Sequence, residues 1–253
     1  MKKTLSLLLA AAAASAFAAE EFKGFSLNSD GSINISGVSN SLTVAITLDS
    51  SMLQGFAGKD NPIISFSGAY SGNDDTTQDS CMAGVGFYYR TQTESEIRAF
   101  AYKKKTAYDR PGSYNAFRNP TPMPEGHNAI KSQRFAFNML EMMVVVMAVT
   151  ENPGTESDRI DTYVYTLDVN GIISKYTGYY SNSNCNVIDP STLKVMQYSS
   201  LTLFNGALSS AEADALANGL LPANPTPSVP EPATATLSLL ALGALAARRR
   251  REK

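Results

Sequence analysis

The sequence is poor in the residues that build most metal centres and nucleophilic active sites. Its 253 residues include one histidine, two cysteines and no tryptophan. Cys81, Cys185 and His127 do not have the spacing of a zinc site, so we expect no metal centre built on them. A Ser-His-Asp triad would have to use His127, and no Gly-x-Ser-x-Gly elbow occurs in the sequence. His127 follows three prolines in an irregular segment, which favours a surface histidine without a catalytic role.

Basic residues are also scarce in the middle of the chain. Leaving out the two lysines near the N-terminus and the last 25 residues, 14 Lys and Arg stand against 21 Asp and Glu, a net charge of −7. Proteins that bind nucleic acids neutralise phosphates with Lys and Arg. The one short basic run, residues 103–105, is more typical of an exposed strand end or loop. We therefore expect no nucleic-acid partner.

The N-terminus has the three parts of a secretory signal peptide. Lys2 and Lys3 are followed by an apolar stretch over residues 5–14 and by small residues up to Ala19. Such a segment is removed from the mature protein and takes no part in its fold. We expect cleavage after Ala18 or Ala19, which makes residues 1–19 a signal peptide and the following residues an exported protein.

The C-terminus combines a proline motif, an apolar run and a basic cluster. Pro230-Glu231-Pro232 precedes an Ala- and Leu-rich run over residues 233–247, and four arginines follow. The run is short against the roughly 20 residues of a stable transmembrane helix, and the arginines stay on the cytoplasmic side. Residues 229–253 resemble the PEP-CTERM sorting signal, in which a membrane-embedded exosortase recognises Pro-Glu-Pro. The resemblance implies processing by such an enzyme and transient anchoring in the inner membrane.

The middle of the chain alternates polar and apolar residues with the period of β-strands. The run over residues 142–149 is instead continuously apolar, which is typical of a strand buried on both faces. We expect an all-β fold of two antiparallel sheets, a jelly-roll sandwich, with one short C-terminal helix. The other expected strands are residues 32–36, 41–48, 63–66, 83–89, 96–102, 135–137, 162–169, 172–179 and 195–205.

Three local sequence patterns predict a turn, a helix and a spacer near the end of the expected domain. Asn170-Gly171 joins two strand patterns and predicts a β-hairpin with a type I′ turn. Ser209 and Glu212 have the spacing of a capping box, and Asn218-Gly219 is expected to end the helix that they begin. Residues 222–232 contain five prolines, which predicts a stiff, extended spacer.

The expected last strand and helix resemble the closing element of LamG-like domains of the concanavalin A-like lectin/glucanase superfamily. The resemblance lies in residues 200–212, in the strand and turn over residues 167–171, and in the type of the strand over residues 41–48. It implies a LamG-like jelly-roll domain over residues 22–221. The family usually carries a tryptophan before its central strand, a place that Phe135 or Met142 would fill here.

Two cysteines in an exported protein predict a disulfide between Cys81 and Cys185. Closing a loop of about 100 residues would contribute roughly 4–5 kcal/mol in the chain-entropy model. The alternative, two separate buried thiols, stays open at this point.

Candidate catalytic carboxylates are few. Glu94 and Glu96 have the i, i+2 spacing that places two side chains on one face of a strand, as a glycosidase requires. The glucanases that the fold resembles use a third acid and flanking aromatic residues, which are missing here. A solvated strand edge is the better interpretation, and we predict no catalytic residue. The acidic loop over residues 71–79 has enough oxygen atoms for Ca²⁺ but lacks the EF-hand pattern, so a hydrated loop is favoured and no cofactor is predicted.

Tyrosine is plentiful in the chain and suits a binding surface. Its ring stacks on the apolar face of a sugar and its hydroxyl forms hydrogen bonds, although most strand tyrosines pack in cores. We therefore expect an exported, non-catalytic recognition module for glycan or another extracellular polymer, in the periplasm, on the outer surface or in the matrix. A polysaccharide-cleaving enzyme and a purely structural matrix protein are the alternatives. The tyrosines of the expected domain are Tyr88, Tyr89, Tyr102, Tyr108, Tyr114, Tyr163, Tyr165, Tyr176, Tyr179, Tyr180 and Tyr198.

Overall fold

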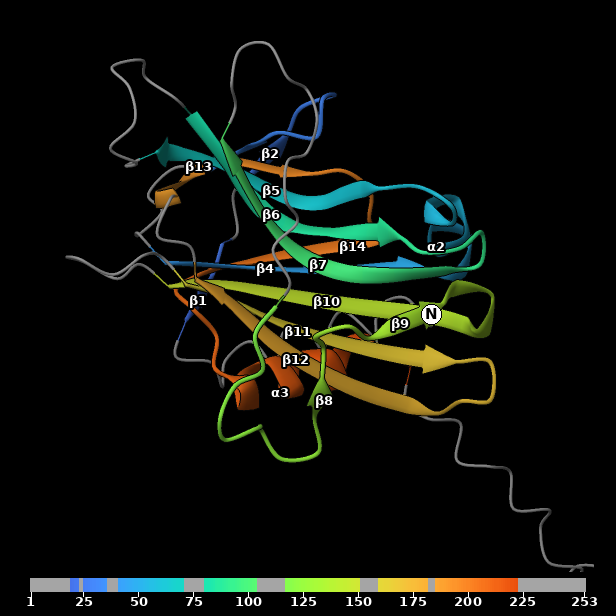
Figure 1. Cartoon of the computed structure of the whole chain (residues 1–253). Coiled ribbons are helices and arrows are strands. Elements are labelled where there is room, and N and C mark those ends of the chain that lie inside the picture. The colour runs from blue at the N-terminus through green and yellow to red at the C-terminus, as the bar shows by residue number, and fades with distance from the viewer. Residues whose placement is uncertain are drawn as a thin grey trace, which may run out of the picture. The chain divides into compact units, whose positions relative to one another are not determined.

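The computed structural model describes residues 19–22, 25–35, 41–70, 80–103, 117–150, 159–181 and 185–222. Contacts divide the chain into two units, Met1–Leu221 and Pro222–Lys253. The first unit contains all the described strands and helices (Figure 1). The second, apart from Pro222, lies outside the described residues. None of the described helices is long and apolar enough to span a lipid bilayer.

The larger sheet has seven strands in the order β1-β14-β4-β10-β11-β12-β8. Its neighbours pair antiparallel, apart from the parallel pair of β12 and β8. The two edge strands, β1 and β8, have only two residues each, so each covers only part of its neighbour, β14 or β12. The strands are β1 (Glu20–Glu21), β4 (Leu42–Asp49), β8 (Asn128–Ala129), β10 (Leu140–Thr150), β11 (Arg159–Asp168), β12 (Ile173–Ser181) and β14 (Ser200–Asn205).

The smaller sheet has five strands in the order β13-β5-β6-β7-β9, all paired antiparallel. A separate two-stranded sheet joins β2 (Ser26–Leu27) to β3 (Ile33–Asn34). The two helices are α2 (Ser50–Phe56) and α3 (Ser210–Leu220), and a 3₁₀ turn, η1 (Phe137–Met139), follows β9. The strands of the smaller sheet are β5 (Asn61–Tyr70), β6 (Ser80–Tyr89), β7 (Glu94–Lys103), β9 (Arg134–Ala136) and β13 (Cys185–Val195).

The main core lies between the two sheets, and β10 explains why both faces of the larger sheet are apolar. Met143, Val145 and Met147 of β10 belong to the core between the sheets, whereas Val144 and Val146 belong to a second cluster with α3. All residues from 143 to 149 are buried, which confirms the predicted strand with two buried faces. The fold is therefore an all-β sandwich with a short C-terminal helix, as the sequence predicts.

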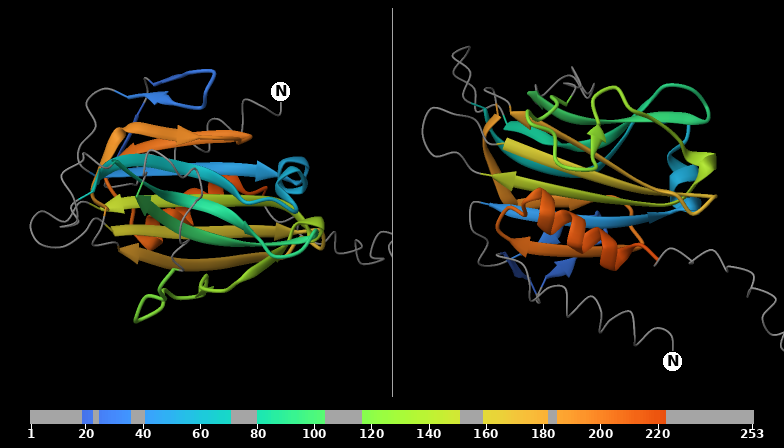
Figure 2. Two further views of the ribbon diagram at one scale, coloured as in Figure 1. Left: turned by 45° about the horizontal axis from the view of Figure 1, so that its top comes forward. Right: turned by 90° about the horizontal axis from the view of Figure 1, so that it is seen from below.

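Helix α3 covers the outer face of the larger sheet (Figure 2, right). Its predicted capping box is confirmed, because the Ser209 backbone N–H donates to Glu212 and the Glu212 backbone N–H donates to Ser209 Oγ. The predicted end at Asn218-Gly219 is wrong, since the helix continues to Leu220. Buried Leu216 and Ala217 continue the apolar face past that point, and Pro222 disfavours helical backbone at Leu221.

The predicted hairpin is confirmed, but its predicted turn type is wrong. A type I′ turn needs positive φ at both central residues, whereas only Gly171 of the Asn170-Gly171 pair has it, with φ of 78°. The Gly171 N–H instead bonds to the Asp168 carbonyl, and Asp168 and Ile172 close a three-residue loop. The Asp168 carboxylate explains the difference, because it accepts from the backbone N–H groups of Asn170 and Ile172 at 2.9 and 2.7 Å.

The two cysteines lie on strands that are not neighbours. Cys81 of β6 pairs with Gly68 of β5, and Cys185 of β13 pairs with Tyr70 on the other side of β5. Two strand spacings amount to about 10 Å, whereas disulfide-bonded Cα atoms lie within about 7 Å of each other. The side chains of both cysteines lie outside the described part of the structure. The predicted disulfide is thus not confirmed.

Candidate functional site

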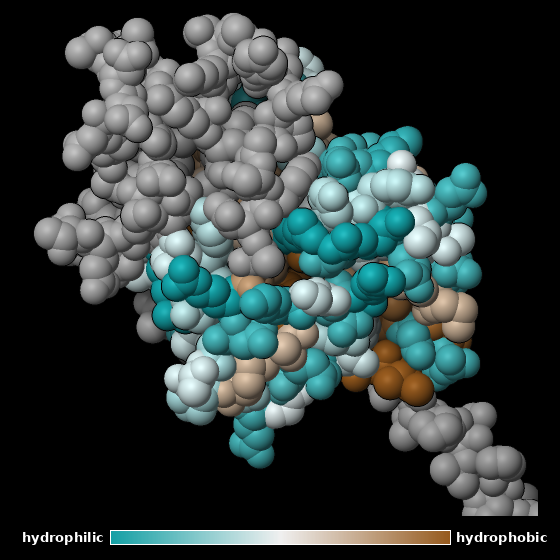
Figure 3. All heavy atoms as spheres, in the orientation of Figure 1, coloured by the Kyte–Doolittle hydropathy of each residue, from teal (hydrophilic) through white to brown (hydrophobic). Residues whose placement is uncertain are grey.

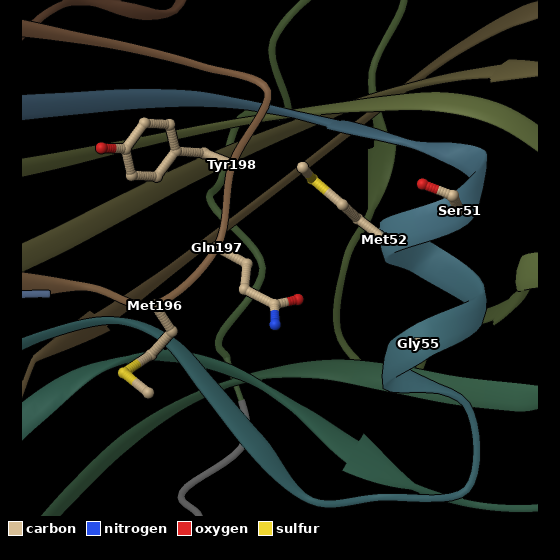
Figure 4. A pocket seen from close by; sticks show the side chains of 6 residues that line it. All are labelled: Ser51, Met52, Gly55, Met196, Gln197 and Tyr198. Carbon is tan, nitrogen blue, oxygen red and sulfur yellow. The ribbon is translucent and has the colours of Figure 1, made fainter. Parts of the chain in front are cut away.

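A shallow, open pocket of about 480 Å³ lies between α2 and the segment that joins β13 to β14. Figure 4 shows the Met52 side chain and the Gln197 amide directed into the space between the two segments, while Met196 and Tyr198 extend away from α2. Tyr198 is half-buried against the main core. The lining residues are Ser51, Met52, Gly55, Met196, Gln197 and Tyr198. The pocket therefore offers the Gln197 amide, the Ser51 hydroxyl and the Met52 thioether, while the Tyr198 ring and the Met196 thioether belong to lining residues that are directed away from α2.

The Asp49 carboxylate joins the two walls of this pocket. It caps α2, because it accepts from the Met52 backbone N–H at 3.0 Å and from the Ser51 hydroxyl at 2.6 Å. Its other oxygen accepts from the Ser199 hydroxyl at 3.0 Å, in the opposite wall. These hydrogen bonds, that of Ser51 first, lower the pKa of Asp49 and keep it ionised. Both walls are therefore held in place by one carboxylate.

A second cluster of polar residues lies on β6 and β7, around the predicted candidate Glu96. The Glu96 side chain is only 3 % exposed and accepts from Arg90 Nε at 2.6 Å and from Arg98 Nε at 3.0 Å. Both guanidinium groups stack on the Tyr88 ring, at 4.9 Å for Arg90 and 4.0 Å for Arg98. The expectation of a solvated strand edge is wrong for Glu96, because Tyr88 pairs with it directly across the sheet and the two arginines cover it.

The environment of Glu96 determines what its carboxylate can do. Burial alone raises the pKa of Glu96, but the hydrogen bonds and charges of Arg98 and Arg90 outweigh this and hold the pKa below its ordinary value. Glu94, two residues away, is 38 % exposed and lies 3.9 Å from Arg134. A general acid needs a raised pKa, and a nucleophile needs access to the substrate. Glu96 has neither property in this arrangement.

The one histidine of the chain is at the centre of a third cluster, beneath α3. Its side chain is fully buried, and His127 Nε2 lies 3.0 Å from Asp214 Oδ1 of α3. The second oxygen of Asp214 lies 3.1 Å from Lys175 Nζ of β12. Tyr163 and Tyr165 of β11 contact the imidazole edge-on, with ring centroids 6.4 and 6.0 Å away. The predicted surface position of His127 is therefore wrong.

The burial of His127 follows from the path of the segment around it. Residues just after His127 pair with β12, since β8 runs parallel to it and the Ile130 N–H donates to the Thr177 carbonyl. This pairing places the proline-rich segment over the outer face of the larger sheet. Burial also raises the pKa of Tyr163 and of Tyr165, so both hydroxyls stay neutral. The cluster resembles a buried structural contact more than a triad, because no serine or cysteine among the described residues is bonded to the imidazole.

The remaining predicted residues divide between the core and the surface. Tyr163, Tyr165 and Tyr180 are buried, whereas Tyr89 is exposed and Tyr198 lines the pocket. Tyr102 lies at the end of β7, where the side chains of residues 101–103 are outside the description. Tyr108, Tyr114 and the acidic loop over residues 71–79 also lie outside it. In the described part of the chain, no three His, Cys, Asp or Glu side chains come together as a metal site.

Sequence reasoning missed the pocket and the partners of Glu96 and His127. The helix start was readable, because Asp49 before Ser50 and Ser51 is a typical N-cap pattern. The opposite wall, about 145 residues later in the chain, gave no local signal. Asp214 and Lys175 likewise meet His127 only through the folded topology.

Comparison with known proteins bears on the C-terminal segment alone. No curated protein matches the chain. Residues 228–251 match the PEP-CTERM protein-sorting motif, and Pro230, Glu231 and Pro232 lie within the matched residues. The chain is thus an all-β sandwich followed by a PEP-CTERM sorting signal, the mark of an exported, exosortase-processed surface protein.

Proposed function

We propose that this protein is an exported recognition module, in which a LamG-like sandwich binds glycan or another extracellular polymer without cleaving it. The sorting motif over residues 228–251 supports export of the protein. Its Pro-Glu-Pro is the site at which an exosortase would act, and residues 233–247 would hold the precursor transiently in the inner membrane. The released or anchored product would then function in the periplasm, on the outer surface or in the extracellular matrix.

The pocket between α2 and the β13–β14 segment supports the part that concerns binding. A sugar presents apolar C–H faces together with hydroxyl groups, and sites that hold it combine an aromatic ring with a few fixed polar groups. Gln197 and Ser51 supply an amide and a hydroxyl, and Tyr198, which also lines the pocket, supplies a ring on the side away from α2. The shallow, open shape suits a unit of a long polymer that continues past the site on both sides.

The environments of Glu96 and His127 support a protein that does not cleave its ligand. Glu96 is buried and paired with two arginines, and Glu94 faces Arg134. His127 is enclosed between Asp214 and two tyrosine rings, beneath α3 and far in sequence from the pocket residues. Neither cluster belongs to the pocket lining.

Substituting Tyr198 tests the binding proposal. We expect Tyr198→Ala to weaken binding of the full chain to its ligand on a glycan array about tenfold, which corresponds to about 1.4 kcal/mol. Tyr89→Ala is the matched control, because Tyr89 is an exposed tyrosine outside the pocket, and it should leave binding unchanged. Equal loss in both variants would contradict the assignment of the site.

A reducing-sugar assay on the same proteins separates the alternatives. Sugar release that Glu94→Gln or Glu96→Gln abolishes, in a variant that still folds, would overturn the proposal in favour of a polysaccharide-cleaving enzyme. The absence of both binding and release would favour a structural matrix protein. Retained binding without release is the result that the proposal predicts.

A further inference from the structure

One end of the larger sheet exposes apolar side chains that no described residue covers. Met139, Val169 and Ile172 are 46, 47 and 58 % exposed, and they come from two adjoining turns. The Val169 N–H donates to the Met139 carbonyl at 3.0 Å, which places η1 against the turn between β11 and β12. We call these three residues the apolar tip. Figure 3 shows hydrophobic side chains gathered at the surface near this end of the molecule.

The turn that carries the apolar tip is rigid. Asp168 accepts from the backbone N–H groups of Asn170 and Ile172, and its own N–H donates to the Ile172 carbonyl at 3.0 Å. The hydrogen bond from Ile172 first, and then those from Asn170, lower the pKa of Asp168, so the carboxylate stays charged while its hydrogen bonds are satisfied within the turn. Val169 and Ile172 are therefore presented outward by a fixed backbone.

The chain leaves the sandwich at the same end. Helix α3 begins after Leu208, whose N–H donates to Thr43 Oγ1 near the start of β4. It passes over β10 and β11, and its Asp214 reaches Lys175 of β12. Leu220 near its end packs against the second cluster, as Met142 and Ile173 also do. Met142 and Ile173 lie at the ends of β10 and β12 that adjoin the apolar tip. Figure 2 shows α3 running along the sheet in this direction.

The length of the spacer limits how far this end can be from a membrane. Eleven residues, 222–232, separate the sandwich from the apolar run of the sorting segment. A proline-rich chain extends by about 3.1 Å per residue, so the spacer reaches at most about 34 Å. While the sorting segment is in the membrane, the bilayer is therefore present at a high effective concentration near the apolar tip.

We propose that the apolar tip rests on the lipid bilayer while the precursor is held by its sorting segment. Three apolar side chains at a rigid turn form a weak interfacial contact, which is stable only when a second attachment supports it. Removal of the sorting segment would withdraw that support, and the tip would then leave the membrane. The contact would orient the sandwich with its C-terminal end towards the bilayer before processing.

The absence of tryptophan from the chain allows a direct test. Ile172→Trp in the full chain provides a single reporter, since the protein has no other tryptophan. We use vesicles of phosphatidylethanolamine and phosphatidylglycerol, with and without brominated acyl chains that quench tryptophan on contact. Leu27→Trp is the matched control, because Leu27 is 45 % exposed on the separate two-stranded sheet.

The proposal predicts a shift of the Ile172→Trp emission to shorter wavelength and a loss of emission with brominated lipid, with neither change in Leu27→Trp. Val169→Trp should behave like Ile172→Trp, and circular dichroism confirms that each variant is folded. Emission unaffected by brominated lipid in both tip variants would overturn the proposal. A wavelength shift without quenching would also overturn it, and would point to contact with a second copy of the chain. None of these outcomes depends on glycan binding.

Discussion

Glu96→Ala is expected to lower the free energy of unfolding by about 3 kcal/mol. The substitution removes a carboxylate that is 3 % exposed and leaves Arg90 and Arg98, both stacked on Tyr88, facing each other without a counter-charge. Breaking a buried ion pair on one side is costly, because the remaining charges lose their partner and cannot fully regain their hydration. Urea denaturation followed by circular dichroism measures the change.

The matched control for this prediction is Glu94→Ala on the same strand. Glu94 is 38 % exposed, and its nearest atom pair with Arg134 is 3.9 Å apart, so its loss should cost less than about 1 kcal/mol. Similar losses in the two variants would contradict the account of the Glu96 cluster.

The Glu96 cluster also predicts how stability depends on pH. The folded pKa of Glu96 lies below its unfolded value of about 4.3, so its contribution is fully present above that pH. The contribution is lost as the pH falls from there through the lowered folded pKa. The free energy of unfolding of Glu96→Gln should therefore fall less steeply than that of the parent protein below about pH 4.3. Parallel curves over this range would count against the ion pairs.

His127→Ala is expected to destabilise the sandwich by about 3 kcal/mol. The fully buried imidazole fills the space between α3 and β11, where it contacts Tyr163 and Tyr165 edge-on and bonds to Asp214. Its removal leaves a cavity and removes the contact with Asp214, which links the proline-rich segment to α3. The same urea denaturation measures the loss.

Lys175→Ala is the control for His127, because it removes the other partner of the same Asp214 carboxylate. Lys175 is 28 % exposed, so this half-solvated ion pair should contribute at most about 1 kcal/mol. A loss in His127→Ala no larger than that in Lys175→Ala would show that the imidazole is not part of the packed core.

The sequence predicted the sandwich well because burial on a sheet leaves a local pattern. The unbroken apolar run of β10 follows directly from its two buried faces. Residues 42–48 of β4 are also all buried, and the sequence still alternates because Thr43 and Thr47 satisfy their hydroxyls with hydrogen bonds to Gly206 and Ser200. The capping box of α3 was readable for the same reason, since both partners lie within one turn. Helix α2 was missed because seven residues that include Gly55 give too short a pattern. The turn type was missed because the Asp168 side chain, and not the Asn-Gly pair alone, selects the loop.

The clusters beneath the surface were misread because their burial depends on partners from elsewhere in the chain. Glu96 looked solvated among polar neighbours, but the stacking of Arg90 and Arg98 on Tyr88 encloses it. His127 looked exposed after three prolines, yet Asp214 lies 87 residues further along the chain. The sequence around a polar residue does not show whether the residue is buried, because burial depends on distant parts of the chain. The sorting motif could be identified because it is a continuous stretch of sequence.

Both ends of the chain are expected to be removed, and the all-β sandwich between them to be exported. Mass spectrometry of the protein from cells that contain an exosortase tests this expectation most directly. We predict an N-terminus after Ala18 or Ala19 and a C-terminus near Pro230, without Arg248 to Arg251. A protein in the cytosol that keeps Met1 and the four arginines would contradict it.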